Sequence, residues 1–161
     1  LMQDLLAYGR PVAPVFHEMP LKQVVEVAMR ACTSIAAKHR VTVSAAFSDD
    51  ATVVADRDRL GRAIENVIMN AIQHSSPESR VVVATRHRDK CAEVVVRDEG
   101  RGFTPGDLPR VFEPFFSRRK GGTGLGLALV HQIVTEHGGE ISAANAAGGG
   151  AEVVISVPAK S

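Results

Sequence analysis

The stretch Asp98-Glu99-Gly100-Arg101-Gly102 decides how the rest of the sequence is interpreted. It follows an apolar run, residues 92–97, that is typical of a buried strand, and it places a carboxylate at the strand's end with glycines at alternate positions. Glycine permits backbone angles and a close ligand approach that other residues forbid. The carboxylate of Asp98 could therefore accept hydrogen bonds from an exocyclic amine while the glycine backbone covers a flat ring. A simple Asp-Gly turn is the alternative interpretation.

An amphipathic helix is predicted upstream, from the good N-cap residue Asp56 to about Ser75. Its apolar stripe consists of Leu60, Ile64, Val67, Ile68, Ala71 and Ile72. Its polar face, within roughly a 60° arc at ~100° per residue, holds Arg62, Asn66, Asn70 and Gln73. Asparagine is a mediocre helix former because its amide competes for nearby backbone groups. Two asparagines one turn apart therefore indicate either a functional face or an ordinary solvated face.

A long irregular segment and a glycine cluster lie downstream. About twenty-five residues after Asp98 show little periodicity, and such a connection inside a compact domain is usually a lid or a binding loop. It ends in Gly121-Gly122-Thr123-Gly124-Leu125-Gly126-Leu127, which runs into a helix predicted from about Gly124 to His137. Glycines at a helix start expose N–H groups at the positive end of the dipole, which suits phosphates. The cluster is neither a P-loop nor a dinucleotide fingerprint, because it lacks the P-loop's Lys-Ser/Thr and a directly preceding strand.

The remaining periodicities complete an α/β pattern. Residues 21–40 predict a helix with one buried face. Strands are predicted at residues 41–47, 80–87, 92–97, 140–144 and 152–157, the last two forming a hairpin across Gly148-Gly149-Gly150. Helices and strands in this order predict a two-layer α/β sandwich of helices on a mixed β-sheet.

Composition excludes several classes of function. The 161 residues are 45% apolar and 23% charged, which is ordinary for one globular domain. Nineteen basic and eighteen acidic residues leave a net charge of +1, so nucleic acid is not an expected partner. No apolar run approaches the ~18 residues that cross a bilayer, so no membrane contact is expected. Cys32 and Cys91 have no ligand-like spacing, and neither a disulfide framework nor a zinc site is predicted.

Four motifs in this order resemble the catalytic and ATP-binding domain of bacterial sensor histidine kinases. Asn66-Val67-Ile68-Met69-Asn70-Ala71 resembles the family's N box, and Asp98-x-Gly100-x-Gly102 resembles its first glycine box. Phe112-Glu113-Pro114-Phe115-Phe116 resembles the F box, and residues 122–127 resemble the second glycine box. The family shares the wider Bergerat fold with DNA gyrase, mismatch-repair MutL and the large heat-shock chaperone ATPases. The resemblance covers essentially the whole chain.

The resemblance implies a Mg²⁺-ATP site. Asn70 would supply an amide oxygen to Mg²⁺, which keeps several waters and takes few protein ligands. Asp98 would accept from the adenine amino group, the backbone of residues 124–126 would hold phosphates, and the F-box phenylalanines would anchor the lid, with few other apolar anchors. The implied nucleotide-binding residues are Asn66, Asn70, Gln73, His74, Asp98, Gly100, Gly102, Phe103, Arg119, Gly122, Thr123, Gly124, Leu125, Gly126 and Leu127. Those implied as catalytic are Asn66, Asn70 and Arg119.

The residue one turn before Asn70 separates a kinase from a hydrolase within this resemblance. In gyrase-type enzymes a carboxylate there acts as general base for water, whereas this chain has Asn66, whose amide cannot take a proton at neutral pH. Glu65 points about 100° away. Phosphoryl transfer is therefore favoured over ATP hydrolysis. The intact motifs also argue against a third alternative, a regulatory module that binds nucleotide and has lost transfer.

Gln73-His74 departs from the Lys-Tyr or Lys-His that many relatives carry and resembles the nitrogen-regulation type of kinase. One charged contact to phosphate is therefore missing. Arg119 could replace it, and a solvated loop is the alternative.

The resemblance also divides the chain into three parts. Residues 1–10 would end a dimerisation hairpin whose acceptor histidine lies further upstream, residues 11–20 would be a linker, and residues 21–161 would be the catalytic and ATP-binding domain. We therefore expect a cytoplasmic fragment of a parent protein that could be membrane-anchored, with the hairpin and a response regulator receiver domain as partners. His17-Glu18-Met19-Pro20 imitates an acceptor motif, but it lies among prolines and not on a long helix.

Overall fold

The computed structural model describes residues 13–48, 51–114, 116 and 126–160. Its centre is a five-stranded sheet in the order β2-β4-β5-β7-β6. The strands are β2 (Thr42–Phe47), β4 (Arg80–Arg88), β5 (Cys91–Asp98), β6 (Glu140–Asn145) and β7 (Ala151–Pro158). β2 pairs parallel to β4, whereas each other neighbouring pair is antiparallel. The sheet is therefore mixed, as predicted.

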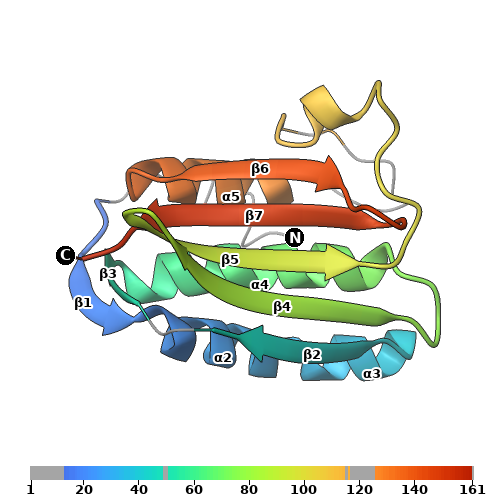
Figure 1. Cartoon of the computed structure of the whole chain (residues 1–161), viewed down its shortest axis with the longest axis horizontal. Coiled ribbons are helices and arrows are strands. Elements are labelled where there is room, and N and C mark those ends of the chain that lie inside the picture. The colour runs from blue at the N-terminus through green and yellow to red at the C-terminus, as the bar shows by residue number, and fades with distance from the viewer. Residues whose placement is uncertain (1–12, 49–50, 115, 117–125, 161) are drawn as a thin grey trace.

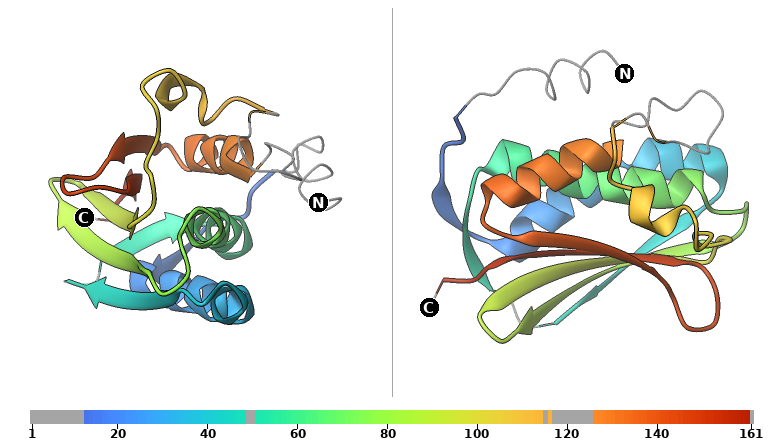
Figure 2. Two further views of the ribbon diagram at one scale, coloured as in Figure 1. Left: turned by 90° about the vertical axis from the view of Figure 1, so that its right-hand side faces the viewer. Right: turned by 90° about the horizontal axis from the view of Figure 1, so that it is seen from above.

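Helices cover one face of this sheet (Figure 1). They are α2 (Leu21–Ala31), α3 (Thr33–His39), α4 (Arg57–Gln73) and α5 (Gly126–Glu136). α4 lies between α2 and α5, and Figure 2 shows the helices as one layer above the sheet. The predicted two-layer α/β sandwich is confirmed. Within the described ranges, no helix combines the length and apolar character that crossing a bilayer requires.

The apolar stripe of α4 fixes this helix on the sheet. All six predicted stripe residues are buried, among them Leu60, Ile64 and Ile68. They join one core with inward-facing residues of the central strands such as Val83 and Val96. Burying a Leu or Ile side chain stabilises the fold by about 1.5–3 kcal/mol. The side chains on the opposite face of α4 are thereby held at fixed positions.

The single helix predicted over residues 21–40 is wrong, because the chain breaks into α2 and α3 at Cys32. Cys32 has φ −95° and ψ 1°, outside the helical region, and its N–H donates to the carbonyl of Met29 at 3.1 Å. The side chain of Cys32 is fully buried. Thr33 and Ser34, which follow, are weak helix formers. The helix is thus interrupted at a buried residue that is followed by two residues of low helix propensity.

Two short strands were not predicted. β1 (His17–Pro20) pairs antiparallel with β3 (Thr52–Ala55) in a separate two-stranded sheet. Four-residue strands are too short for an alternating pattern to stand out. Residues 17–20 of the expected linker therefore pair with the domain, and Met19 is buried in its core.

Candidate functional site

Asp98 lies buried at the end of β5, with only 5% of its surface exposed. Its Oδ1 accepts hydrogen bonds from two backbone N–H groups, those of Gly100 at 2.8 Å and Ala151 at 3.0 Å. Among the described residues, no donor contacts its other oxygen, Oδ2. A buried carboxylate requires hydrogen-bond partners. Asp98 is therefore held by one oxygen, while its other oxygen faces no donor from the described residues.

The glycines after Asp98 are required by close contacts within the chain. A Cβ on Gly100 would lie 2.6 Å from the carbonyl oxygen of His74, just after α4. Gly102 has φ +75°, and a Cβ there would collide with the side chain of Asn145. The first glycine box therefore packs directly against the C-terminal end of α4 and the end of β6. These contacts bring Asp98 close to the helix that carries the N box.

The polar residues of the N box lie on α4 as predicted. Asn66 and Asn70 are half-buried, and the amide nitrogen Nδ2 of Asn66 is buried with no hydrogen-bond partner in the described part of the chain. Gln73 is the last residue of α4. His74 caps the helix, and its exposed ring lies 2.9 Å from the carbonyl oxygen of Asn70 through Nδ1. An orphaned buried donor is unfavourable unless a ligand or a water supplies the acceptor.

The second glycine box is described only at its end. Gly126 and Leu127 begin α5, whereas Gly122, Thr123, Gly124, Leu125 and Arg119 lie outside the described residues. α5 runs antiparallel to α4, because Arg59 near the start of α4 pairs with Glu136 at the end of α5. Since both helices rise equally per residue, the start of α5 lies about level with Asn70. The N box and the end of the second glycine box thus share one end of the domain.

The lid is described at residues 103–114 and 116, and Phe115 lies outside the described residues. The ring of Phe112 stacks on His131 of α5 with centroids 6.0 Å apart, and the guanidinium of Arg110 lies over Phe116 at 4.7 Å. Val111 is 6% exposed and is therefore an apolar anchor. Val111 thus adds one apolar anchor to the phenylalanines, and the expectation of few further anchors stays a prediction.

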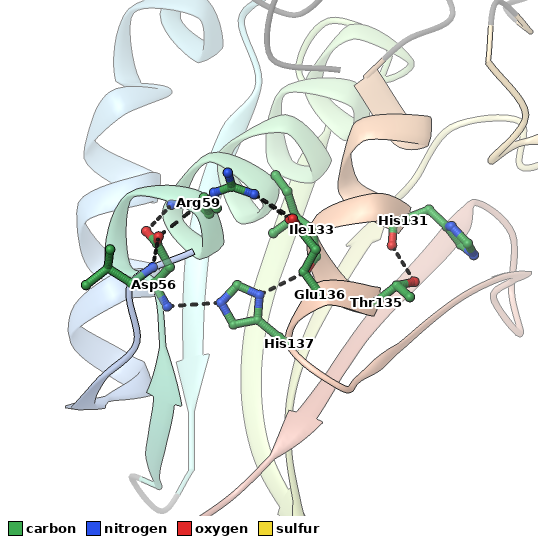
Figure 3. A network of polar contacts seen from close by, with 8 residues as sticks. Asp56, Arg59, His131, Ile133, Thr135, Glu136 and His137 are labelled. Atoms are coloured by element: carbon green, nitrogen blue, oxygen red, sulfur yellow. Dashed lines mark hydrogen bonds and ion pairs between the residues drawn. The ribbon is translucent and has the colours of Figure 1, made fainter. Parts of the chain in front are cut away.

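A polar network fixes the opposite end of α4 (Figure 3). The carboxylate of Asp56 accepts from the N–H of Arg59 at 3.1 Å, which confirms the predicted N-cap, and from the N–H of Val15 at 2.9 Å. Arg59 donates to both carboxylate oxygens of Glu136, at 2.6 and 2.7 Å. Burial alone would raise the pKa of the Asp56 carboxyl, but these N–H groups and the charge of Arg59 hold its pKa below the ordinary value. The network joins α4, α5 and the segment that enters β1.

His137 sits at the centre of this network and is 93% buried, with an exposed fraction of 7%. Its Nε2 accepts from the backbone N–H of Asp56 at 3.0 Å, and its Nδ1 lies 2.8 Å from the carbonyl oxygen of Ile133. A backbone N–H only donates and a carbonyl only accepts, so Nε2 is the acceptor and Nδ1 the donor in these two contacts. The ring of Phe16 meets it edge-on, with centroids 5.2 Å apart.

Sequence reasoning missed two polar residues that shape the domain. Asn145 contacts the first glycine box and its neighbour Phe103, and His137 accepts from the N–H of Asp56; no structural role was predicted for either residue. The glycines at 148–150, which begin three residues after Asn145, predict a turn there, but no feature of the sequence marks the contact that Asn145 makes. The two cysteines are free, and burial with the nearby charge of Glu65 raises the pKa of the Cys32 thiol to about 11. Cys32 is therefore a core residue.

Comparison with known proteins identifies the family. The family described as histidine kinase-, DNA gyrase B- and HSP90-like ATPase matches residues 55–161. Sensor histidine kinase ZraS of Klebsiella oxytoca is 33% identical over 160 residues, which are 98% of this chain and 35% of ZraS. Sensor histidine kinase component HK1 of Mycobacterium tuberculosis is 35% identical over 152 residues, 92% of this chain and 82% of HK1. This chain thus spans about a third of ZraS but most of HK1.

A solved structure agrees with these relatives. Mycobacterial sensor histidine kinase MprB superposes with a TM-score of 0.81 at 31% identity, covering 91% of this chain and 99% of that one. The chain belongs to the histidine kinase-, DNA gyrase B- and HSP90-like ATPase family, as a catalytic and ATP-binding domain of the sensor histidine kinase type.

Proposed function

We propose that this domain binds Mg²⁺-ATP and transfers the γ-phosphoryl group to a histidine on an upstream dimerisation hairpin, for relay to the receiver domain of a response regulator. The bond between the γ-phosphorus and the bridging oxygen breaks, a bond from the γ-phosphorus to an imidazole nitrogen forms, and ADP leaves. Positioning and charge neutralisation dominate such transfers. The observation that carries the proposal is the contact between the Asp98 loop and the end of α4, made through Gly100 and His74.

In this proposal, the Oδ2 atom of Asp98 recognises adenine by accepting a hydrogen bond from its exocyclic amine. The exocyclic amine of adenine donates hydrogen bonds, whereas guanine presents a carbonyl oxygen at the equivalent position, which a carboxylate cannot bind. Because Oδ1 is already held by the N–H groups of Gly100 and Ala151, only Oδ2 is available to this amine. A hydrogen bond to a charged group is worth about 1.5–3 kcal/mol.

The residues of the N box suit Mg²⁺. The side chain of Asn70 is half-buried and has no hydrogen bond to another described residue, so its amide oxygen is available as a neutral ligand. Mg²⁺ usually takes few protein ligands and several waters, and when bound it neutralises triphosphate charge. The orphaned Nδ2 of Asn66 cannot bind a cation, but it can donate to a phosphate oxygen or to a water. Asn70 would thus bind the cation, and Asn66 would donate to an anionic phosphate oxygen or to a water.

Asn66 also favours transfer over hydrolysis. An activated water needs a base to take its proton, and an amide cannot act as one.

The proposed phosphate-binding residues belong to the lid and the second glycine box: Arg119, Gly122, Thr123, Gly124 and Leu125, together with Gly126 and Leu127 at the start of α5. Gln73 and His74 motivate the assignment to the nitrogen-regulation type.

We also propose that residues 1–10 end the hairpin of a parent kinase that could be membrane-anchored, with this domain on the cytoplasmic side. The chain covers about a third of ZraS, which leaves room for such parts in relatives.

The proposal is tested with radiolabelled ATP incubated with this chain, with the folded dimeric hairpin of its parent protein, and with both. Acid-labile label on the hairpin in the mixture alone supports the kinase. ATP turnover without label would indicate a hydrolase, and nucleotide binding with neither would indicate a regulatory module. Stable label at His17 would overturn its assignment as an imitation of the acceptor motif.

A further inference from the structure

We propose that Asn145 is a positioning residue of the adenine site, which it shapes by holding the loop of residues 98–103. The proposal rests on the proposed reading of adenine by Asp98. Figure 1 shows the segment after β5 passing the turn between β6 and β7, and Asn145 is the last residue of β6.

The side chain of Asn145 forms hydrogen bonds with both polar groups of the Phe103 main chain. Its Oδ1 accepts from the N–H of Phe103 at 2.6 Å, and its Nδ2 donates to the carbonyl oxygen of Phe103 at 2.9 Å. The side-chain amide therefore pairs with Phe103 through two hydrogen bonds, as the backbone of a neighbouring strand would. No other side-chain type offers an acceptor and a donor amide at this length.

The turn after Asn145 packs against the other end of the same loop. Gly150 has φ +88°, and a Cβ there would collide with the carbonyl oxygen of Asp98. The N–H of Ala151 donates to Oδ1 of Asp98, and the turn is closed by a bond from the N–H of Ala146 to the carbonyl of Gly150 at 2.9 Å. The hairpin thus holds the loop at Asp98 and at Phe103, while His74, just after α4, packs against it at Gly100.

These contacts set the direction in which the free oxygen of Asp98 points. A loop fixed at only one end could turn the carboxylate or lift away from the ring that it covers. Phe103 also begins the lid, so Asn145 sets where the lid leaves the domain. Neither role needs contact between Asn145 and the nucleotide.

The test compares ATP and GTP titrations of the unmutated chain, Asn145→Ala, Asn145→Asp and the control Ser142→Ala, which alters an exposed residue of β6. Asn145→Ala is expected to lower the affinity for ATP about tenfold, as for one or two lost hydrogen bonds. The weak affinity for GTP should stay within about twofold of its original value, so the ATP-to-GTP ratio falls. Asn145→Asp keeps the acceptor and loses the donor, so its loss should be intermediate. Ser142→Ala should change neither affinity.

Hydrogen exchange of the Phe103 amide in the nucleotide-free chain gives a second readout. Exchange should accelerate in Asn145→Ala and stay unchanged in Ser142→Ala. An unchanged ratio of affinities in Asn145→Ala, or an equal loss for both nucleotides, would overturn the proposal. Equal binding of ATP and GTP by the unmutated chain would instead overturn the reading of adenine by Asp98. If Asn145→Ala does not fold, Asn145→Asp carries the same test.

Discussion

The two ends of α4 are rich in polar side chains, but they use them in opposite ways. At the N-terminal end, Asp56, Arg59, Glu136 and His137 all find partners within the chain. At the C-terminal end, the Nδ2 atom of Asn66 is buried with no partner in the described ranges, and Oδ2 of the buried Asp98 has none either. The named groups at the N-terminal end satisfy their hydrogen bonds on folding, whereas these two atoms find no partner among the described residues, as our proposed nucleotide site requires. Mutations at the N-terminal end should therefore lower the stability of the fold, whereas mutations at the other end should lower the affinity for nucleotide.

The largest expected effect is on stability, from His137→Ala. The variant loses a buried ring and leaves the N–H of Asp56 without an acceptor, so the free energy of unfolding should fall by about 3 kcal/mol. Urea unfolding followed by circular dichroism measures this change. Thr135→Ala, an exposed change in α5 just before His137, is the control and should stay within about 0.5 kcal/mol of the unmutated chain. Below its unfolding temperature, His137→Ala should bind ATP almost normally, and a large loss of affinity would break the comparison.

Asp98→Asn should have the next largest effect, and on binding. The amide oxygen can still accept from the N–H groups of Gly100 and Ala151, so the fold is retained, while a donor replaces the free acceptor. The affinity for ATP should fall about thirtyfold, or about 2 kcal/mol, in calorimetric titration. Glu99→Gln removes an exposed neighbouring carboxylate and should leave the affinity nearly unchanged. A loss of stability as large as that of His137→Ala would place Asp98 among the structural residues.

Asn70→Ala tests whether the N box binds Mg²⁺. Because the lost atom is a proposed magnesium ligand, the affinity for ATP should fall about tenfold with Mg²⁺ and less than about twofold in excess chelator. The same titration with and without Mg²⁺ measures both values on one variant. An equal loss in both conditions would mean that Asn70 contacts the nucleotide directly or supports the fold.

The smallest expected effect is the pH dependence of Asp56. Because its folded pKa lies below the ordinary value of 3.8, its carboxylate stabilises the fold above that value, and the contribution is lost as the pH falls through the folded pKa. Asp56→Asn keeps one acceptor and loses the charge, so it should be about 1 kcal/mol less stable at neutral pH. Unfolding measured from about pH 7 to about pH 3 should show this difference shrinking below about pH 4. A constant difference would assign the effect to lost packing.

Much of the domain was predictable because its signals are local. The stripe of α4 and the cap at Asp56 were both confirmed, and periodicity and caps are properties of neighbouring residues. The failures also have local causes. β1 and β3 are four residues each, and the break at Cys32 has no glycine or proline to mark it.

The sequence by itself determined the class of fold and the four motifs with their polar side chains, since each motif and each element depends on residues close together along the chain. Only the tertiary structure decided which polar groups are satisfied. Asn145 meets Phe103 across 42 residues, and His137 meets Asp56 across 81. Such pairs leave no periodic trace, because hydrogen bonds between distant segments depend on how the sheet and helices bring them together.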